Sequence, residues 1–446
     1  MRVLLFVFLY LLGSLNLVSA EINPKRIALK NGITLFVIER HTLPIISVEL
    51  LIPSGAINDP AYRSGVASLT ASLLDEGTKN RTSKQISEEV DFIGASLSAS
   101  ADLDTTAVSL RVLKKDIEKG FDLLSDILLN PSFETRELDR VRQLVLGSIH
   151  AEKDDPGVIA SRAFDKIVFG NHPYRHPIIG TEETVKSIER DDLVSFYQNH
   201  YLPKGSFFSI VGNVTEKEAV NLVEKYFSKW GDHREKPTRT VPISPPVAQP
   251  QKTELIQKDL TQTTVLMGHL GVRRNSPDFY PIAVMNYILG GGGFSSRLLT
   301  HIRDNKGLVY SVHSSFSSYR QEGSFEISLQ TKASNTNEAI LAVREEIDKI
   351  RKDGVTKTEL DEAKAYLIGS FPLRLETTGK LAKLLSALGF HNLGLSYFND
   401  YPQYIEKVTA AAILKAAQTY LRPEALTLVV VGNIAEAKIK DQHGLK

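Results

Sequence analysis

Two short apolar runs and one alternating stretch predict β-strands in the first half of the chain. Residues 33–39, ITLFVIE, and residues 46–52, ISVELLI, are apolar and are joined by a short loop that contains Pro44. Residues 95–113 alternate and are rich in β-branched residues, which is typical of a hairpin. We therefore expect two strands followed by a hairpin.

Helical spacing of apolar residues follows each group of strands. The first helical pattern ends at the pair Asn130-Pro131, because proline cannot continue a helix. Helices are expected over residues 115–130, 131–155, 335–354 and 357–371, and a further strand over residues 324–333. Strand groups alternating with pairs of helices predict α+β units, each with helices layered on one face of a mainly antiparallel sheet.

One predicted helix carries small polar residues where a functional helix would carry reactive ones. Residues 65–78, GVASLTASLLDEGT, have apolar residues at helical spacing and should be mostly buried. Ser68 and Ser72 lie one turn apart on a single face, with Ala71 beside Ser72. None of these three side chains is suited to bind a metal or to move a proton.

A proline-rich segment divides the chain. Residues 236–253, KPTRTVPISPPVAQPQKT, are typical of a semi-extended linker. It separates residues 21–235 from residues 254–446, two pieces of similar size.

The two pieces end alike, which indicates a tandem duplication. Val211-Gly212-Asn213 near the end of the first matches Val431-Gly432-Asn433 near the end of the second. Tyrosine and proline residues precede both matches at similar distances. A repeat of this length predicts two homologous domains and not a solenoid.

Residues 1–20 have the pattern of a secretory signal peptide. Arg2 precedes an unbroken apolar run over residues 3–12, and Val18-Ser19-Ala20 is a small-residue cleavage site. The alternative is an uncleaved anchor. We expect an exported protein, periplasmic or secreted, with no membrane contact after cleavage.

Composition excludes several classes of function. Lys plus Arg number 53 and Asp plus Glu 52, and removal of residues 1–20 takes one Arg and no acid, which leaves 52 of each. A balanced charge does not favour nucleic acid or an anionic membrane as a partner. With no cysteine, the chain has no disulfide, thiolate nucleophile or cysteine-based metal site.

The second half contains a glycine-rich run followed by a candidate catalytic pair. Four glycines, from Gly290 to Gly293, precede Phe294, from which a helix is expected to run to about Lys306 before a strand begins. The run lacks the Lys-Ser/Thr pair of a phosphate-binding loop, so the simplest interpretation is a flexible turn.

Arg303 and Tyr310 are seven residues apart across the predicted turn from helix to strand. Together a guanidinium and a phenol can donate hydrogen bonds to one carbonyl oxygen. The alternative is structural, with an exposed helical arginine and a tyrosine whose ring faces the core.

Motifs along nearly the whole chain after residue 20 resemble one enzyme family. In chain order they are residues 63–110, HAEKDDP (150–156), FGNHPYRHPIIGT (169–181), YLPKGSFFSIVGNV (201–214), LGGGGFSSRL (289–298) and IRDNKGLVYS (302–311). They are similar to the pitrilysin/insulinase family of zinc peptidases, in its short-chain, processing-peptidase-like branch. The resemblance implies half of a clamshell-shaped peptidase.

The resemblance also implies that the zinc site is lost. In active members the first helix carries the motif H-x-x-E-H. Residue by residue, the two histidines fall on Ser68 and Ser72, the general-base glutamate on Ala71, and the downstream glutamate ligand on Ser148, or on Gly147 if the register slips by one. Serine is a poor zinc ligand and alanine cannot deprotonate water, so this chain should bind no cofactor itself.

The two motifs that resemble the second unit of the family, LGGGGFSSRL and IRDNKGLVYS, are intact. The resemblance assigns Arg303 and Tyr310 to stabilisation of the transition state at the scissile carbonyl. It assigns substrate contact to the loop residues Gly291, Gly292, Gly293 and Phe294. Some short-chain members divide zinc and the Arg/Tyr pair between two chains, and this sequence resembles the second kind.

The resulting hypothesis is a zinc-free subunit of a heterodimeric peptidase, inactive alone, whose homologous partner holds zinc and whose substrates are peptides or unfolded polypeptides. The alternative is a non-catalytic binding or scaffold protein of the same fold. His172 and His176 are four residues apart, but prolines interrupt any helix between them, so a metal site there is not favoured.

Overall fold

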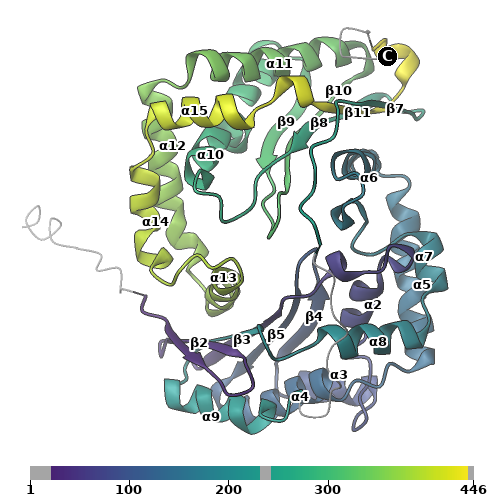
Figure 1. Cartoon of the computed structure of the whole chain (residues 1–446), viewed down its shortest axis with the longest axis vertical. Coiled ribbons are helices and arrows are strands. Elements are labelled where there is room, and N and C mark those ends of the chain that lie inside the picture. Colours follow the sequence, from purple (N-terminus) through teal and green to yellow (C-terminus); the bar gives the residue numbers. More distant parts are fainter. Residues whose placement is uncertain (1–21, 232–242, 440–446) are drawn as a thin grey trace, which may run out of the picture.

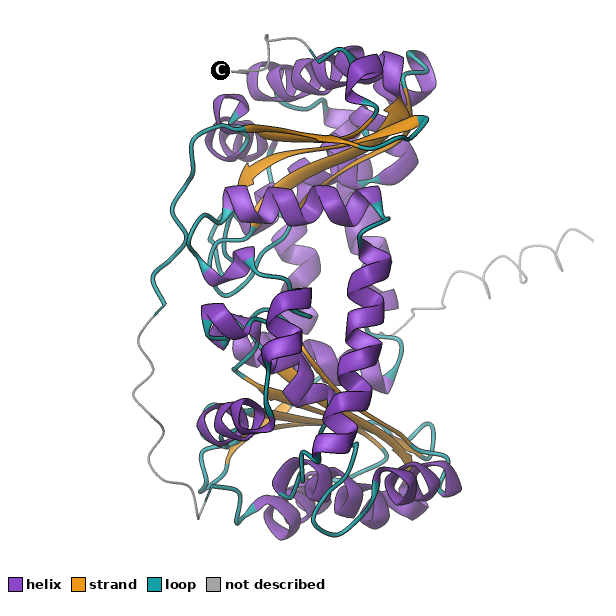
Figure 2. Ribbon diagram, turned by 90° about the vertical axis from the view of Figure 1, so that its right-hand side faces the viewer, coloured by secondary structure: helices purple, strands orange, loops and turns teal. Residues whose placement is uncertain are grey.

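The computed structural model describes residues 22–231 and 243–439, which form two α+β units stacked one above the other (Figure 1). Each unit is built on one sheet with helices on its outer face, and Figure 2 shows further helices between the two sheets. The predicted fold class is confirmed. The predicted signal peptide and residues 236–242 of the predicted linker lie outside the described residues. Among those described, no helix has the length and apolar character needed to cross a bilayer.

The first sheet has six strands and the second has five. In spatial order, the first holds β1 (Lys25–Ala28), β2 (Thr34–Glu39), β6 (Phe207–Gly212), β3 (Ile45–Ile52), β5 (Thr106–Leu113) and β4 (Ser96–Ala101). The second holds β7 (Thr253–Gln257), β11 (Thr427–Gly432), β8 (Gln262–Leu270), β10 (Ser324–Lys332) and β9 (Val309–Phe316). The strands predicted from residues 33–39, 46–52, 95–113 and 324–333 are all present.

The helices follow the same order in both units. The first unit holds α2 (Val66–Ser72), α3 (Ser83–Phe92), α4 (Ile117–Leu129), α5 (Thr135–Glu152), α6 (Pro156–Val168), α7 (Glu182–Ser187), α8 (Arg190–His200) and α9 (Glu216–Phe227). The second holds α10 (Phe279–Asn286), α11 (Thr336–Asp353), α12 (Lys357–Ser370), α13 (Thr378–Phe390), α14 (Tyr397–Glu406), α15 (Ala410–Tyr420) and α16 (Ile434–Ala437). The helices predicted over residues 115–130, 131–155, 335–354 and 357–371 correspond to α4, α5, α11 and α12, and the helix predicted within residues 65–78 corresponds to the shorter α2.

The strand pairing of the two sheets is equivalent. In the first, β6 lies between a parallel neighbour, β2, and an antiparallel neighbour, β3. In the second, β11 lies in the same way between β7 and β8. Two further antiparallel strands complete each sheet on the same side. This shared topology is the structural form of the sequence repeat.

The repeated glycine has a steric cause. Gly212 and Gly432 end the equivalent strands with φ of 145° and 154°. A Cβ atom at Gly212 would lie 2.2 Å from the carbonyl oxygen of Ile45, and one at Gly432 would lie 3.0 Å from that of Gln262. Ile45 and Gln262 each begin the adjacent antiparallel strand. The same close approach therefore requires glycine in both units.

Each unit also places one helix on the inner face of the other unit's sheet. Helix α6 packs on β11 and β8, where Phe164 and Val168 join a buried apolar cluster with Val429 of the second sheet. Helix α13 packs on β3 and β6, where the hydroxyl groups of Ser386 and Ser209 are 2.8 Å apart. This exchange joins the units directly (Figure 1).

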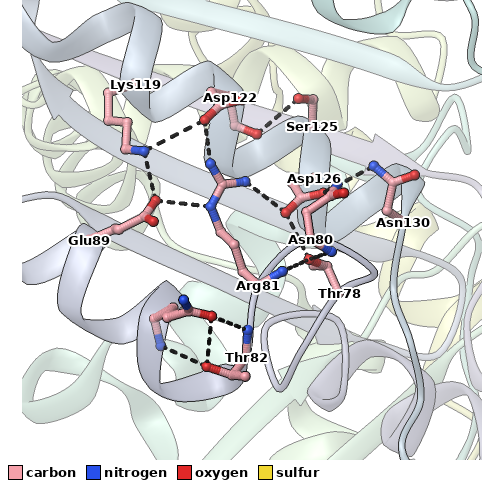
Figure 3. A network of polar contacts seen from close by, with 11 residues as sticks. Thr78, Asn80, Arg81, Thr82, Glu89, Lys119, Asp122, Ser125, Asp126 and Asn130 are labelled. Atoms are coloured by element: carbon pink, nitrogen blue, oxygen red, sulfur yellow. Dashed lines mark hydrogen bonds and ion pairs between the residues drawn. The ribbon is translucent and has the colours of Figure 1, made fainter.

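An ion-pair network fixes the loop that follows α2 (Figure 3). The Arg81 guanidinium donates to Glu89 at 2.9 Å, Asp122 at 2.6 Å and Asp126 at 2.7 Å. Asp126 also accepts from Thr78 at 2.8 Å, with further donors from Asn80 and Asn130. The loop carrying Arg81 is thereby held against α4 and α3.

Candidate functional site

Helix α2 begins where two backbone N–H groups meet a buried carboxylate. Asp59 accepts from the N–H of Gly65 at 2.7 Å and from that of Ala67 at 2.9 Å. Such bonds satisfy donors that the first turn of a helix leaves free. Burial raises the pKa of Asp59 to about 7, while the two N–H donors act in the opposite direction. Asp59 thus determines where α2 starts.

The two serines form the one open face of α2. The other five residues of the helix are buried, including Ala71 at 0% exposed, whereas Ser68 and Ser72 are half-buried. Ser148 lies exposed on α5, which contacts α2, and its hydroxyl donates to the carbonyl oxygen of Leu144 at 3.2 Å. The helix is therefore buried except along the face that carries Ser68 and Ser72.

These residues do not fit a zinc ion. Zinc in proteins takes imidazole, thiolate or carboxylate ligands, and Ser68, Ser72 and Ser148 offer only neutral hydroxyls. Within residues 22–231 and 243–439, no cluster of three or more His, Cys, Asp or Glu residues is arranged to hold a metal.

The glycine-rich run, for which the sequence alone favours a flexible turn, begins as helical structure with close contacts at Gly290 and Gly292. A π-helical turn, Tyr287–Gly291, extends α10 into the run. A Cβ atom at Gly290 would lie 2.6 Å from the Ser314 hydroxyl, and one at Gly292 would lie 2.6 Å from the Tyr287 carbonyl oxygen. Gly293 has open space around it and φ of 61°. Close packing and then a left-handed backbone account for the glycines.

The helix expected to start at Phe294 begins later. Residues 293–295 form a 3₁₀ turn, and a second π-helical segment, Leu299–Asn305, carries Arg303. Phe294 is 80% exposed, and the Arg303 guanidinium lies 5.8 Å from the centre of its ring. Arg303 has no acidic partner in the described part of the chain, so its N–H donors remain available.

Tyr310 is the extra residue of a β-bulge. In the pairing of β9 with β10, Val309 lies opposite Thr331 and Ser311 opposite Gln330, which leaves Tyr310 without a partner. An uninterrupted alternation would turn Tyr310 to the same face as the buried Val312. The bulge gives that place to Val309 and leaves Tyr310 49% exposed. Bulges re-aim side chains in this way beside active sites.

A buried hydroxyl stabilises the bulge. Thr331, which is 0% exposed, donates its hydroxyl to the carbonyl oxygen of Leu308 at 2.5 Å. The helical segment of Arg303 contacts β9, and the N–H of Gly307 closes the segment on the Arg303 carbonyl at 3.0 Å. Arg303 and Tyr310 are therefore carried on adjoining elements joined by a short, hydrogen-bonded turn.

Comparison with known proteins identifies the family. A model of the insulinase peptidases, family M16, matches residues 35–182, and a model described as the peptidase M16 inactive domain matches residues 187–367. An uncharacterized zinc protease of Streptomyces coelicolor is 30% identical over 332 residues, 73% of this chain and 72% of that protein. This chain belongs to the insulinase family. The resemblance inferred from the sequence is confirmed.

Other insulinase relatives cover nearly the whole chain. An uncharacterized zinc protease of Bacillus subtilis is 27% identical over 91% of this chain and 98% of its own length. The crystal structure of a peptidase M16 inactive domain from Pseudomonas fluorescens matches with a TM-score of 0.87 at 27% identity, over 92% of this chain and 98% of that one. A protease structure from Helicobacter pylori shares the fold, with a TM-score of 0.82 at 22% identity, over 92% and 100% of the two chains.

His172 of this insulinase-family chain makes polar contacts through both ring nitrogens. His172 Nε2 lies 2.7 Å from the Gln321 amide oxygen, and its Nδ1 accepts from the N–H of Tyr174 at 3.2 Å. Burial lowers the pKa of His172, which favours the neutral ring. A 3₁₀ turn, Pro173–Arg175, separates His172 from His176. His172 therefore links the first unit to the second.

Sequence reasoning missed Asp59 and Thr331. Asp59 precedes Pro60 in a loop, and nothing nearby in the sequence marks it as the acceptor for α2. Thr331 reads as one β-branched strand residue among several. Their importance comes from groups that they meet in three dimensions.

Proposed function

We propose that this chain is the zinc-free subunit of a heterodimeric insulinase-family metallopeptidase. A homologous partner would supply zinc and the general base, and this chain would supply Arg303, Tyr310 and half of the substrate chamber. The observation that carries the proposal is the bulge that turns Tyr310 outward, seven residues after an arginine with free donors. A purely structural tyrosine would have packed its ring in the core.

The pair suits stabilisation of negative charge on an oxygen atom. A guanidinium and a phenol both donate hydrogen bonds, and donors fixed beforehand stabilise an oxyanion as charge develops. Held by a closed turn and by a bulge, the two side chains approach a carbonyl with little reorganisation. The ring of Phe294 lies beside Arg303, and Phe294 together with the preceding glycines Gly291 to Gly293 would contact the peptide.

The residues of helix α2 support the proposal that this chain is a subunit and not an independent enzyme. Ser68, Ala71, Ser72 and Ser148 occupy the positions that the family resemblance assigns to zinc ligands and base, and none can take that role. The helix is kept for packing, since five of its residues are buried. Substrates would be peptides or unfolded polypeptides, met after export to the periplasm or medium.

The test is reconstitution with the zinc-bearing partner, a chain with an intact H-x-x-E-H motif that copurifies with tagged protein. Arg303→Ala and Tyr310→Phe should each lower turnover by about 10²–10³, because each removes one donor to the oxyanion. Tyr62→Phe is the matched control, since Tyr62 is 73% exposed and lies on the first unit. Dimer formation, measured by light scattering, should be unchanged.

The alternative of a non-catalytic scaffold predicts the opposite result. Turnover unaffected by both substitutions, with a normal dimer, would reject a catalytic role for the pair. A chain that copurifies only with proteins lacking the H-x-x-E-H motif would favour the scaffold as well.

A further inference from the structure

The outer edges of the two equivalent sheets differ. In the first sheet β1 pairs antiparallel with the outer edge of β2, with Lys25 opposite Val37. In the second sheet β7 occupies the place of β2, and no strand of the described residues lies beyond it. The duplicated architecture therefore has a strand position that is filled in one unit and open in the other.

Strand β7 presents unpaired backbone groups at this edge. The carbonyl oxygen of Lys252 accepts from Leu428 at 2.8 Å, and the N–H of Lys258 donates to Gly432 at 2.9 Å. The backbone groups of the even-numbered residues from Lys252 to Lys258 are thus directed toward β11. The alternation of a strand then turns the N–H and C=O groups of Thr253, Leu255 and Gln257 outward. An edge of this kind is a template for pairing with another chain.

A cavity of about 1050 Å³ reaches the same strand. Its walls are the C-terminal turn of α5, one face of α6, the loop over residues 170–182 and residues 249–254. Helix α6 contributes the apolar side chains of Ile159, Ala163 and Ile167, and β7 contributes Glu254. Side chains of a strand added beside β7 would have this volume available to them.

The charges around the cavity are unequal. Lys153 pairs with Glu182, Arg162 with Glu152, and Lys252 with Glu254. These are the three acidic residues of the lining.

Two further cations of the lining, Lys166 and Arg175, have no acidic partner in the described residues. The cavity consequently complements an anionic group with apolar neighbours.

We propose that the outer edge of β7 binds an extended acidic polypeptide segment as an added strand, antiparallel to β7 as β1 is to β2. Backbone bonds to Thr253, Leu255 and Gln257 hold the segment. Its alternate side chains enter the cavity, where Lys166 and Arg175 receive carboxylates. This site does not depend on the proposed catalytic role, because the chain alone contains every group that it uses.

The test measures fluorescence polarisation of a short labelled peptide of alternating glutamate and valine, titrated with the purified chain without a partner. Leu255→Pro should weaken binding by about tenfold, because it removes an outward N–H and no bond to β11. Lys166→Glu should weaken binding by a similar factor, about tenfold. Lys407→Glu, at an exposed lysine remote from the cavity, is the matched control and should leave binding unchanged.

Three results would overturn the proposal. The first is the absence of saturable binding by the unmodified chain. The second is binding that neither Leu255→Pro nor Lys166→Glu changes, which places the peptide elsewhere. The third is self-association of the chain that Leu255→Pro abolishes, which identifies a second copy as the occupant. A peptide of alternating lysine and valine should bind more weakly than the acidic one.

Discussion

Replacement of Arg81 by alanine should strongly destabilise the first unit. The Arg81 side chain is 16% exposed and that of Asp126 is 5% exposed, so their ion pair is shielded from water (Figure 3). Loss of one partner from a buried pair typically costs about 3–5 kcal/mol, because the other charge stays buried. Here Asp126 keeps the donors Thr78, Asn80 and Asn130. We therefore expect the free energy of unfolding to fall by about 2–3 kcal/mol.

The other two carboxylates contribute less to this estimate. Glu89 and Asp122 have side chains 32% and 43% exposed. In the variant, water can therefore solvate these two carboxylates in place of the Arg81 guanidinium. Burial alone would raise the pKa of Asp126, but its hydrogen bonds outweigh burial and lower the pKa below the ordinary 3.8. Its contribution is therefore complete above that pH and is lost as the pH falls through the lower folded value.

The assay is urea unfolding followed by tryptophan fluorescence. Trp230, the one tryptophan of the chain, is 2% exposed in the core of the first unit and reports that unit's transition. Arg81→Ala should move the midpoint to lower urea with the slope unchanged. Arg136→Ala, at an exposed arginine on α5, is the matched control. A free energy of unfolding of Arg81→Ala within about 0.5 kcal/mol of the unmodified chain would refute the reasoning.

Three further predictions concern metal, pH and the contact between units. Elemental analysis of the chain after mild dialysis should find no stoichiometric zinc, and one bound equivalent with chelator-sensitive proteolysis would contradict the assignment of Ser68 and Ser72. Burial and the nearby Glu326 raise the pKa of Asp165 to about 8, so stability should fall as the pH rises from about 4 to about 8. Asp165→Asn should remove this decline, so the melting temperature of the variant should exceed that of the unmodified chain by a difference that grows from pH 4 to pH 8. Gly268→Ala should lower the free energy of unfolding, measured in urea, by about 1–3 kcal/mol. A Cβ atom there would lie 2.0 Å from the Phe325 carbonyl oxygen and 2.8 Å from the Phe164 ring.

Local patterns were sufficient to predict several strands and helices, though not most of them. Apolar periodicity is set by which face of an element is buried, so residues 33–39, 46–52 and 95–113 were recognisable as strands. The match of Gly212 with Gly432 also survives in the sequence, because only glycine tolerates the close approach at both strand ends. The repeat and the family resemblance follow from residue identity alone, and so does the prediction that Ser68 and Ser72 stand where the family has zinc ligands.

The orientation of Tyr310 depends on tertiary structure. Its strand pattern is compatible with a ring in the core, and the bulge that turns it outward arises only when β9 pairs with β10. The Thr331 hydroxyl, which donates a hydrogen bond to the Leu308 carbonyl oxygen, belongs to β10. Likewise, Gly290 is required by its close contact with Ser314 of β9, a strand that follows it in the chain and packs against it.

What the sequence determined by itself is a part of the set of elements, the duplication and the family resemblance. Only the tertiary structure decided how the units meet, with α6 and α13 exchanged between them, and which sheet edge stays open at β7. The physical reason is the distance along the chain over which each effect acts. Periodicity and residue identity act over a few neighbouring positions, whereas a bulge, a shared core or an unfilled strand position depends on groups far apart in sequence that folding brings within contact distance.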